Sequence, residues 1–340
     1  MKTNNVIKLS ANENCYGCSK QAINAGMQHF SEIFAYPEVD PNDLKHQLAA
    51  KYHVNKTNVV TAAGSVRIIE GLIQTFVGHG GEVLTFDNTF SVYGQLAKNL
   101  NRQCRFAPLT DYICLPENLY PYINDNTQLI FIANPNNPTG TIITHNELET
   151  FLASVPKNIT VVIDEAYAEY VTDASFPDSL ALQKTYPNLV IVRSFSKIYG
   201  LAALRVGYAI LEEKMARKLD SNKIPFSINT IASAAAIAAL ADTCFIYRSA
   251  AQNAEQRELL FTGLKELGHS VIPSQANFLY IDFESSHEKN EVRDQLFHNG
   301  ILVCDLEKSG QEKALRITIG KAEANKKIIS ILERQHSLAY

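Results

Sequence analysis

The sequence predicts an α/β protein with a large domain, built on a mainly parallel sheet flanked by helices, and a smaller α+β domain. Three observations support this prediction. Nearly all-apolar runs alternate with helical patterns in the middle of the chain, as expected for strands buried on both faces of a sheet. This alternation stops after about residue 238, and 340 residues suggest about two domains. We therefore expect a large domain over residues 33–237 and a small domain from residues 1–32 and 238–340.

The elements of the large domain alternate in type along the chain. The expected strands are Val59–Ala62, Glu82–Phe86, Gln128–Ala133, Ile159–Asp164, Asn188–Arg193 and Arg205–Ile210. Apolar residues at helical spacing between positions 68 and 76 predict a helix after the first strand. Such alternation implies right-handed crossovers, and ligands then bind beyond the carboxyl ends of the strands. The polar residues that end these runs are therefore the candidates for a functional site.

The small domain is expected to combine helices with short strands. The predicted elements are a helix over Thr243–Leu267, strands near Phe278–Phe283 and Leu315–Ile319, and helices near Glu288–Asn299 and Ala322–Gln335.

Composition and charge exclude several classes of protein. Hydrophobic residues make up 46% of the chain and charged residues 19%, which excludes wholesale disorder. The net charge is −4 without a basic run, which argues against a nucleic-acid or membrane partner. The longest apolar stretch, Ile231–Ala241, is far shorter than the ~20 residues of a membrane span, and no leader pattern opens the chain. We expect a soluble cytoplasmic protein.

The six cysteines are spread too thinly for a disulfide framework. Cys15 and Cys18 have CxxC spacing, but neither a second CxxC nor a His pair follows. We interpret them as reduced thiols in a loop and expect no metal site.

Two polar clusters end neighbouring strands. Residues 134–140 place two prolines around asparagines, which makes a rigid turn that can aim the Asn137 amide; an ordinary Asx-Pro turn is the other reading. Asp164 follows four apolar residues and would need a cationic partner if buried, whereas an N-cap is the alternative.

Two further clusters could bind a ligand that carries both an aldehyde and an anionic group. Lys197 follows a buried strand beside the hydroxyls of Ser194 and Ser196, which suits a partly desolvated amine with a lowered pKa that can form a Schiff base. Arg205 can clamp an anion. Ser65 lies where a strand turns into a helix, and free backbone N–H groups there would receive a phosphate.

These groups, with Tyr167 three residues after Asp164, match what pyridoxal 5′-phosphate requires. The runs Arg193–Lys197, Leu204–Gly207, Asn136–Gly140 and Asp164–Tyr167 resemble motifs of fold-type I aminotransferases. The resemblance covers nearly the whole chain and is closest to the histidinol-phosphate aminotransferase branch. The motifs specific to that branch are Ser10–Asn14, Tyr36–Pro37, Thr89–Tyr93 and Leu315–Gly320.

The resemblance implies an amino-acid biosynthesis enzyme that moves an amino group between histidinol phosphate or glutamate and a 2-oxo acid such as 2-oxoglutarate. Two related activities stay open: transamination of a free amino acid, aromatic or otherwise, and decarboxylation of the threonine-phosphate type. A non-catalytic binding protein is the reading from a different class, and the intact Lys197 and Asp164 argue against it.

The resemblance also implies roles for the cofactor-binding residues. Lys197 would hold the cofactor covalently and shuttle the proton, and Asp164 would keep the pyridine nitrogen protonated. Asn137 and Tyr167 would bond the ring oxygen O3′, and Phe90 would stack on the ring. The phosphate would be held by Ser65, Val66, Ser194, Ser196 and Arg205.

On the substrate side, the resemblance implies that Arg316 binds the anionic group of the substrate, with Asn14 and Tyr16 nearby. Tyr36 would reach the phosphate of the neighbouring subunit, so a homodimer is expected.

Two departures from the family pattern bear on the substrate. Val66 and Arg67 stand where many relatives have Asp-Glu, next to phosphate contacts that are largely backbone. Cys304 stands where the branch usually has an arginine for the substrate phosphate. Losing such a partner costs about 1.5–3 kcal/mol, or ten- to a hundredfold in affinity. Cys304 therefore favours an unphosphorylated donor while leaving the transaminase prediction intact.

Overall fold

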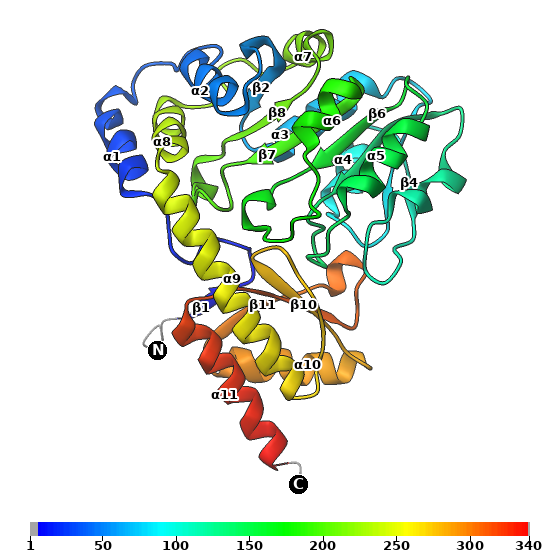
Figure 1. Cartoon of the computed structure of the whole chain (residues 1–340). Coiled ribbons are helices and arrows are strands. Elements are labelled where there is room, and N and C mark those ends of the chain that lie inside the picture. Colours follow the sequence, from blue (N-terminus) through cyan, green and yellow to red (C-terminus); the bar gives the residue numbers. More distant parts are fainter. Residues whose placement is uncertain (1–5, 339–340) are drawn as a thin grey trace.

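The computed structural model describes residues 6–338, which form two sheets, a large one above and a small one below in Figure 1. The strands of the large sheet are β2 (Val59–Ala62), β3 (Glu82–Phe86), β4 (Gln103–Ala107), β5 (Thr127–Ala133), β6 (Thr160–Asp164), β7 (Leu189–Ser194) and β8 (Gly207–Ile210). Their order is β2-β8-β7-β6-β5-β3-β4, and only β8 runs antiparallel to its neighbours. The predicted mainly parallel sheet is confirmed.

Both faces of the large sheet are covered by helices. These are α2 (Asn42–Tyr52), α3 (Ser65–Phe76), α4 (Val92–Asn99), α5 (His145–Ser154), α6 (Ser179–Thr185), α7 (Glu213–Asp220) and α8 (Thr230–Ala241). In β6, Val161 and Ile163 pack in the core cluster with α2, α5, α6 and α8, whereas Val162 packs in the cluster with α3, α4 and α7. Because alternate residues enter two different cores, the strands lack a polar face, as the apolar runs predict.

The small sheet has the order β1-β11-β12-β10-β9. Its strands are β1 (Ile7–Leu9), β9 (Ser270–Ile272), β10 (Phe278–Asp282), β11 (Ile301–Asp305) and β12 (Ala314–Thr318). The long helix α9 (Thr243–Glu266) leads from the large part of the molecule to the small one, where α10 (Ser286–His298) and α11 (Ala322–Leu338) complete the covering layer (Figure 1).

Short helical turns fill several connections: η1 (Phe30–Glu32), η2 (Lys56–Asn58), η3 (Pro116–Tyr122), η4 (Ala168–Tyr170), η5 (Ala202–Leu204) and η6 (Glu307–Ser309). After β1, the chain crosses to α1 (Lys20–Gln28), whose Ala22 packs in the same core cluster as the large sheet. The division into residues 33–237 and residues 1–32 with 238–340 remains a proposal.

The structure differs from the prediction in two instructive places. The edge strand β4 carries mostly exposed or half-buried side chains, so it has no apolar run by which the sequence could reveal it. The strand that we expected to begin at Arg205 begins at Gly207, because Arg205 has a left-handed backbone with φ of 55°.

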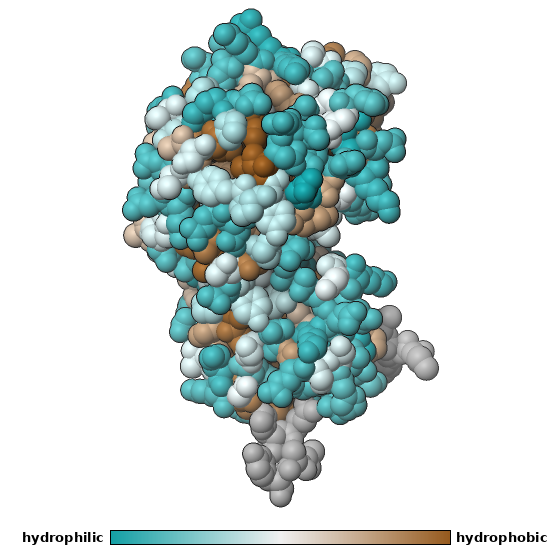
Figure 2. Space-filling model, turned by 90° about the vertical axis from the view of Figure 1, so that its right-hand side faces the viewer, coloured by the Kyte–Doolittle hydropathy of each residue, from teal (hydrophilic) through white to brown (hydrophobic). Residues whose placement is uncertain are grey.

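Within residues 6–338, no single helix is long and apolar enough to cross a membrane; only the bent pair of α8 and α9 passes that test jointly, by length and composition. The face of the molecule seen in Figure 2 is mainly hydrophilic, with apolar residues confined to small patches.

Candidate active site

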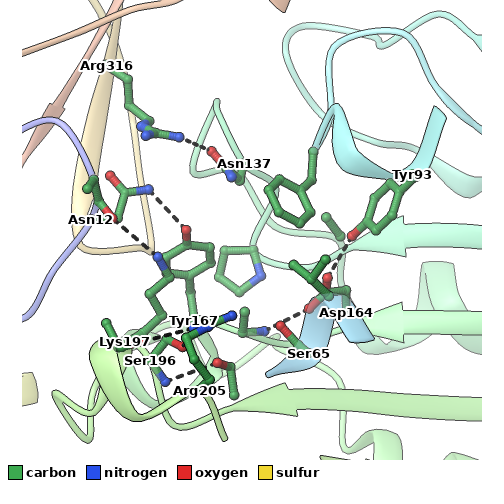
Figure 3. Close-up of a pocket in the computed structure, with 18 residues that line it drawn as sticks. Asn12, Ser65, Tyr93, Asn137, Asp164, Tyr167, Ser196, Lys197, Arg205 and Arg316 are labelled. Carbon is green, nitrogen blue, oxygen red and sulfur yellow. Dashed lines mark hydrogen bonds between the residues drawn. The ribbon is translucent and has the colours of Figure 1, made fainter. Parts of the chain in front are cut away.

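A cavity of about 280 Å³ opens at the carboxyl ends of β5, β6 and β7 (Figure 3). The chain reverses direction here after each strand, so polar side chains from distant segments meet at one edge of the sheet. The predicted site residues that line this cavity are Ser65, Val66, Phe90, Asn137, Asp164, Tyr167, Ser194, Ser196, Lys197, Arg205 and Arg316.

One end of the cavity is built to receive an anion. Helix α3 begins at Ser65, and its N-cap Gly64 has no side chain to accept from the first N–H groups. A Cβ atom on Gly64 would collide with the guanidinium of Arg205, and one on Gly207 would collide with the backbone of Ser65. The two glycines therefore let the arginine and the positive end of the helix dipole approach one another closely. Arg205 also donates to Ser196 Oγ at 3.3 Å.

Lys197 lies in the turn that follows β7. Its Nζ is 3.4 Å from the carbonyl oxygen of Ala11 and 5.3 Å from the centre of the Tyr167 ring. The turn itself is closed by a hydrogen bond of 3.0 Å from the Ser196 N–H to Ser194 Oγ. The amine is half-buried and enters the cavity between the large sheet and the N-terminal segment.

Asp164 is a buried carboxylate at the end of β6. It accepts hydrogen bonds from the Tyr93 hydroxyl at 2.8 Å and from the Ala166 N–H at 3.3 Å. Burial raises the pKa of Asp164 to about 6, although both hydrogen bonds oppose the change. Among the described residues no salt bridge reaches Asp164, and the charge of Lys197 opposes the rise in its pKa less than burial promotes it. The cationic partner expected for a buried carboxylate at this position stays a prediction. Its charge is left to be satisfied from the cavity.

Two other residues of the cavity were not identified from the sequence. Tyr93 stacks on Phe131 at 4.6 Å between ring centres, which holds its hydroxyl against Asp164. Asn12 donates from Nδ2 to the Tyr167 hydroxyl at 3.0 Å (Figure 3). Tyr93 belongs to the family motif Thr89–Tyr93, three residues after the aromatic Phe90, and this position was the signal by which the sequence could have identified it. Asn12 likewise stands inside the family motif Ser10–Asn14, but nothing in the sequence indicated its contact with Tyr167.

Arg316 extends from β12 over the mouth of the cavity. Its guanidinium donates to Asn137 Oδ1 and to the carbonyl oxygen of Ser10, the latter at 3.0 Å. Its Nε is buried and has no hydrogen-bond partner among the described residues. Asn137 comes from the turn after β5, in which the prolyl bonds of Pro135 and Pro138 are both cis. The arginine and the amide therefore form one polar wall with an unused donor.

Three predicted residues lie outside the cavity wall. Asn14 donates to the carbonyl oxygen of Ile198 at 2.7 Å and accepts from the N–H of Tyr16. The first hydrogen bond connects the loop of Asn14 and Tyr16 to the turn that contains Lys197, and the second lies within that loop. Burial raises the pKa of Tyr16 to about 12. Tyr36 is 87% exposed on the loop after η1, against the ring of Phe226. Their predicted roles toward substrate and phosphate stay predictions.

Cys304 lies in the row of side chains that contains Arg316. In the antiparallel pairing of the small sheet, Cys304 and Tyr280 both stand directly opposite Arg316, on either side of it. Directly paired residues share a face of the sheet, so the neighbours of the arginine in this row carry no positive charge.

The comparisons with known proteins agree with this geometry. Residues 4–332 match the family model of class I and II aminotransferases. The histidinol-phosphate aminotransferase of Anaeromyxobacter sp. (strain Fw109-5) is 39% identical over 97% of this chain and 91% of its own length. That of Moorella thermoacetica (strain ATCC 39073 / JCM 9320) is 37% identical over 96% and 84%.

The chain belongs to the class I and II aminotransferases. The solved histidinol-phosphate aminotransferase of Clostridium acetobutylicum superimposes with a TM-score of 0.88 at 25% identity, covering 98% of this chain and 99% of that one. The enzyme from Sinorhizobium meliloti, solved in complex with pyridoxal-5′-phosphate, has a TM-score of 0.89 at 23% identity, covering 97% and 91%. At that identity it supports the fold-type I architecture.

As a member of this family, the aminotransferase works with pyridoxal 5′-phosphate, and its residues fit that cofactor. The glycine-lined cradle at Ser65 and Arg205 suits a phosphate. Asp164 forms no salt bridge in the described part of the chain and suits a protonated ring nitrogen. The amine of Lys197 opens into the same cavity. Within residues 6–338, no cluster of three or more His, Cys, Asp or Glu could hold a metal, and the six cysteines are free.

Proposed function

We propose that this aminotransferase moves the amino group between histidinol phosphate and 2-oxoglutarate, which becomes glutamate when it receives that group. Pyridoxal phosphate supplies an aldehyde and an electron-accepting ring. Lys197 would bind that aldehyde and then move the proton at the reacting carbon. Asp164 would keep the ring nitrogen protonated, and its burial without a salt bridge within residues 6–338 supports this role. Phe90 would cover the ring, and Tyr167 and Asn137 would bond its phenolic oxygen.

Arg316 would bind the anionic group of each substrate in turn. Its buried Nε is without a partner in the described residues, and this unused donor carries the substrate assignment. One guanidinium can bind a carboxylate and a phosphate by the same planar geometry, which suits two half-reactions at one site. Relatives named histidinol-phosphate aminotransferase at 37–39% identity support the phosphorylated donor.

A free amino acid is the second candidate donor, and the uncharged Cys304 beside Arg316 favours it. Decarboxylation is the third reading. The L-threonine-O-3-phosphate decarboxylase of Porphyromonas gingivalis shares the fold at 21% identity, with a TM-score of 0.84. At that identity the likeness supports the fold alone and not the decarboxylase activity.

A panel of donors separates these readings. Histidinol phosphate, phenylalanine, tyrosine and threonine phosphate are each mixed with the holoenzyme, and the absorbance change of the cofactor is followed together with release of carbon dioxide. We expect histidinol phosphate to give the highest kcat/KM. Equal or better turnover of unphosphorylated donors would reject that assignment, and carbon dioxide release would favour the decarboxylase.

Substitution of Cys304 sharpens the panel. We expect Cys304→Arg to raise the affinity for histidinol phosphate about ten- to a hundredfold, since it adds a charge-assisted partner beside Arg316. Cys304→Ser is the matched control that adds no charge. An unchanged KM in both variants would remove Cys304 from the account of specificity.

We further propose a cytoplasmic homodimer, in which Tyr36 reaches the phosphate of the partner. Large apolar side chains are exposed in and around α1 and the following loop: Ile23, Met27, Phe30, Ile33, Phe34, Tyr36 and Val39. Their number supports burial against a second copy. Six free cysteines support a reducing compartment. Sedimentation of the wild-type protein should give a dimer, and Phe34→Glu should shift it toward a monomer; a wild-type monomer would refute the proposal.

A further inference from the structure

Asn12 lies in the segment that crosses from β1 to α1, and it is 1% exposed. Its φ of 54° is in the left-handed region, which residues other than glycine rarely occupy. Asparagine adopts this conformation more readily than most residues, so the φ value by itself assigns no role to Asn12. The contacts of Asn12 show what holds it and which group it serves.

The backbone of Asn12 is bonded by residues of the small sheet. Its N–H donates to Thr318 Oγ1 at 3.0 Å, at the end of β12. Its carbonyl oxygen accepts from Asn277 Nδ2 at 3.1 Å, just before β10. Both partners are buried. Asn12 is therefore fixed from the small-sheet side of the cavity.

The side chain of Asn12 faces the other side. Thr318 Oγ1 donates to Asn12 Oδ1 at 3.1 Å, and Asn12 Nδ2 donates to the Tyr167 hydroxyl at 3.0 Å (Figure 3). Among residues 6–338, Asn12 Oδ1 is the acceptor of the Thr318 hydroxyl hydrogen. This bond fixes which end of the amide faces the phenol, because the reverse orientation would leave that hydrogen without an acceptor.

The direction of the bond has a consequence for Tyr167. A phenol that accepts from an N–H keeps its own hydrogen for a second partner, and accepting a bond strengthens its donation. The Tyr167 ring cannot easily turn away, since it packs edge-on against Phe278 at 5.1 Å between centres. Its hydroxyl hydrogen is thus left for an acceptor inside the cavity.

We infer that Asn12 is a positioning residue that directs the hydroxyl hydrogen of Tyr167 toward the phenolic oxygen of the bound cofactor. The inference rests on the proposed role of Tyr167. It adds that residues of the small sheet, through Asn12, set the donor strength of a group on the large sheet. Neither the family motifs nor the relatives assign this role to Asn12.

The test is a pH titration of the absorbance of the bound cofactor, together with its dissociation constant. Asn12→Gly removes the amide but suits the left-handed backbone. We expect it to raise the pKa of the bound cofactor by about 0.5–1, because a weaker phenol donor stabilises the deprotonated cofactor oxygen less. Asn101→Gly is the matched control, an exposed asparagine with φ of 55° that does not line the cavity, and should change nothing.

Asn12→Asp tests the direction of the bond. A carboxylate at position 12 accepts the Tyr167 hydrogen and draws it away from the cofactor, so the rise in pKa should exceed that of Asn12→Gly. Thr318→Val leaves residue 12 an asparagine but removes both the donor to its Oδ1 and the acceptor of its N–H, and it should give a smaller rise of the same sign. It serves as the second variant if a change at position 12 prevents folding.

A double-mutant cycle with Tyr167→Phe tests whether Asn12 acts on the cofactor through the Tyr167 hydroxyl. If Asn12 acts through the phenol, Asn12→Gly has no effect on the cofactor pKa in the Tyr167→Phe background. An equal rise in both backgrounds, or no rise with Asn12→Asp, would overturn the inference alone. If Tyr167→Phe itself leaves the cofactor pKa unchanged, the proposed role of Tyr167 fails as well. The two failures are therefore distinguishable.

Discussion

Asp164 and Glu165 are consecutive buried carboxylates at the end of β6, but their side chains have different partners. Glu165 is fully buried and accepts from Arg193 Nε at 2.9 Å and from a second guanidinium nitrogen at 2.7 Å. Ser179 donates to its other oxygen. Among residues 6–338, Asp164 accepts hydrogen bonds from a tyrosine hydroxyl and one backbone N–H alone.

The contrast shows how a structural carboxylate differs from a functional one. The protein supplies the counter-charge of Glu165 from β7, and the pair joins the ends of two strands. For Asp164, the described residues leave the counter-charge to a ligand, and its pKa rises to about 6. An unpaired buried charge costs stability, and that cost is acceptable where a bound cation removes it.

Breaking the paired carboxylate should have the largest effect on stability. Arg193→Met leaves Glu165 buried without its cation, so the free energy of unfolding should fall by about 3–5 kcal/mol. Urea denaturation of the cofactor-free protein measures this change. The double variant Arg193→Met with Glu165→Leu should recover part of the loss, since Glu169, 3.8 Å from the Arg193 guanidinium, still lacks that cation. A single variant as stable as wild type would show that the pair is not structural.

Removing the unpaired carboxylate should raise the free energy of unfolding instead of lowering it. Above pH 6, Asp164→Asn should stabilise the cofactor-free protein by about 2–3 kcal/mol, since no charge is left to bury. The pKa of Asp164 in the folded protein is above the ordinary value of 3.8. The free energy of unfolding of the wild type therefore falls as the pH rises from about 4 to 6, whereas Asp164→Asn has no carboxyl group to ionise there. The two proteins should therefore be equally stable near pH 4.

The same Asp164→Asn variant should hold the cofactor about ten- to a hundredfold more weakly, because the ring nitrogen loses its charged partner. Equilibrium dialysis measures this affinity. A variant that is less stable than the wild type at pH 8, or that binds the cofactor equally well, would remove the distinction between the two carboxylates.

Tyr93→Phe should have a smaller effect on the unpaired site. It removes one donor to Asp164, so the carboxylate is stabilised less and its pKa rises further above 6. The step in the pH profile of stability should move upward, with a change of about 1 kcal/mol. A step at the wild-type pH would show that the hydroxyl does not support the charge.

The smallest change is expected at an exposed ion pair. Lys8 and Glu13 lie 3.1 Å apart with half-exposed side chains. Lys8→Ala should alter the free energy of unfolding by less than about 0.5 kcal/mol, as measured by the same urea titration. A loss comparable to that of Arg193→Met would indicate that burial does not govern the strength of these pairs.

The sequence revealed the elements whose residues share one local pattern. Lys197 and Asp164 could be identified because each follows an apolar run that can only be a buried strand. The choice of Asp164 over Glu165 came from the family resemblance, because adjacent residues in a sequence do not show which side of the sheet holds Arg193. Asn12 was missed because Thr318, which orients its amide, lies more than 300 residues away.

The central claim is that this edge of the large sheet holds pyridoxal phosphate through Lys197. Borohydride reduction of the holoenzyme converts the carbon–nitrogen double bond to a stable amine, and peptide mass mapping then locates the attached group. We predict a phosphopyridoxyl adduct on the peptide that contains Lys197, and none in the Lys197→Ala variant. An adduct on another lysine, or no adduct on the wild-type chain, would contradict the account.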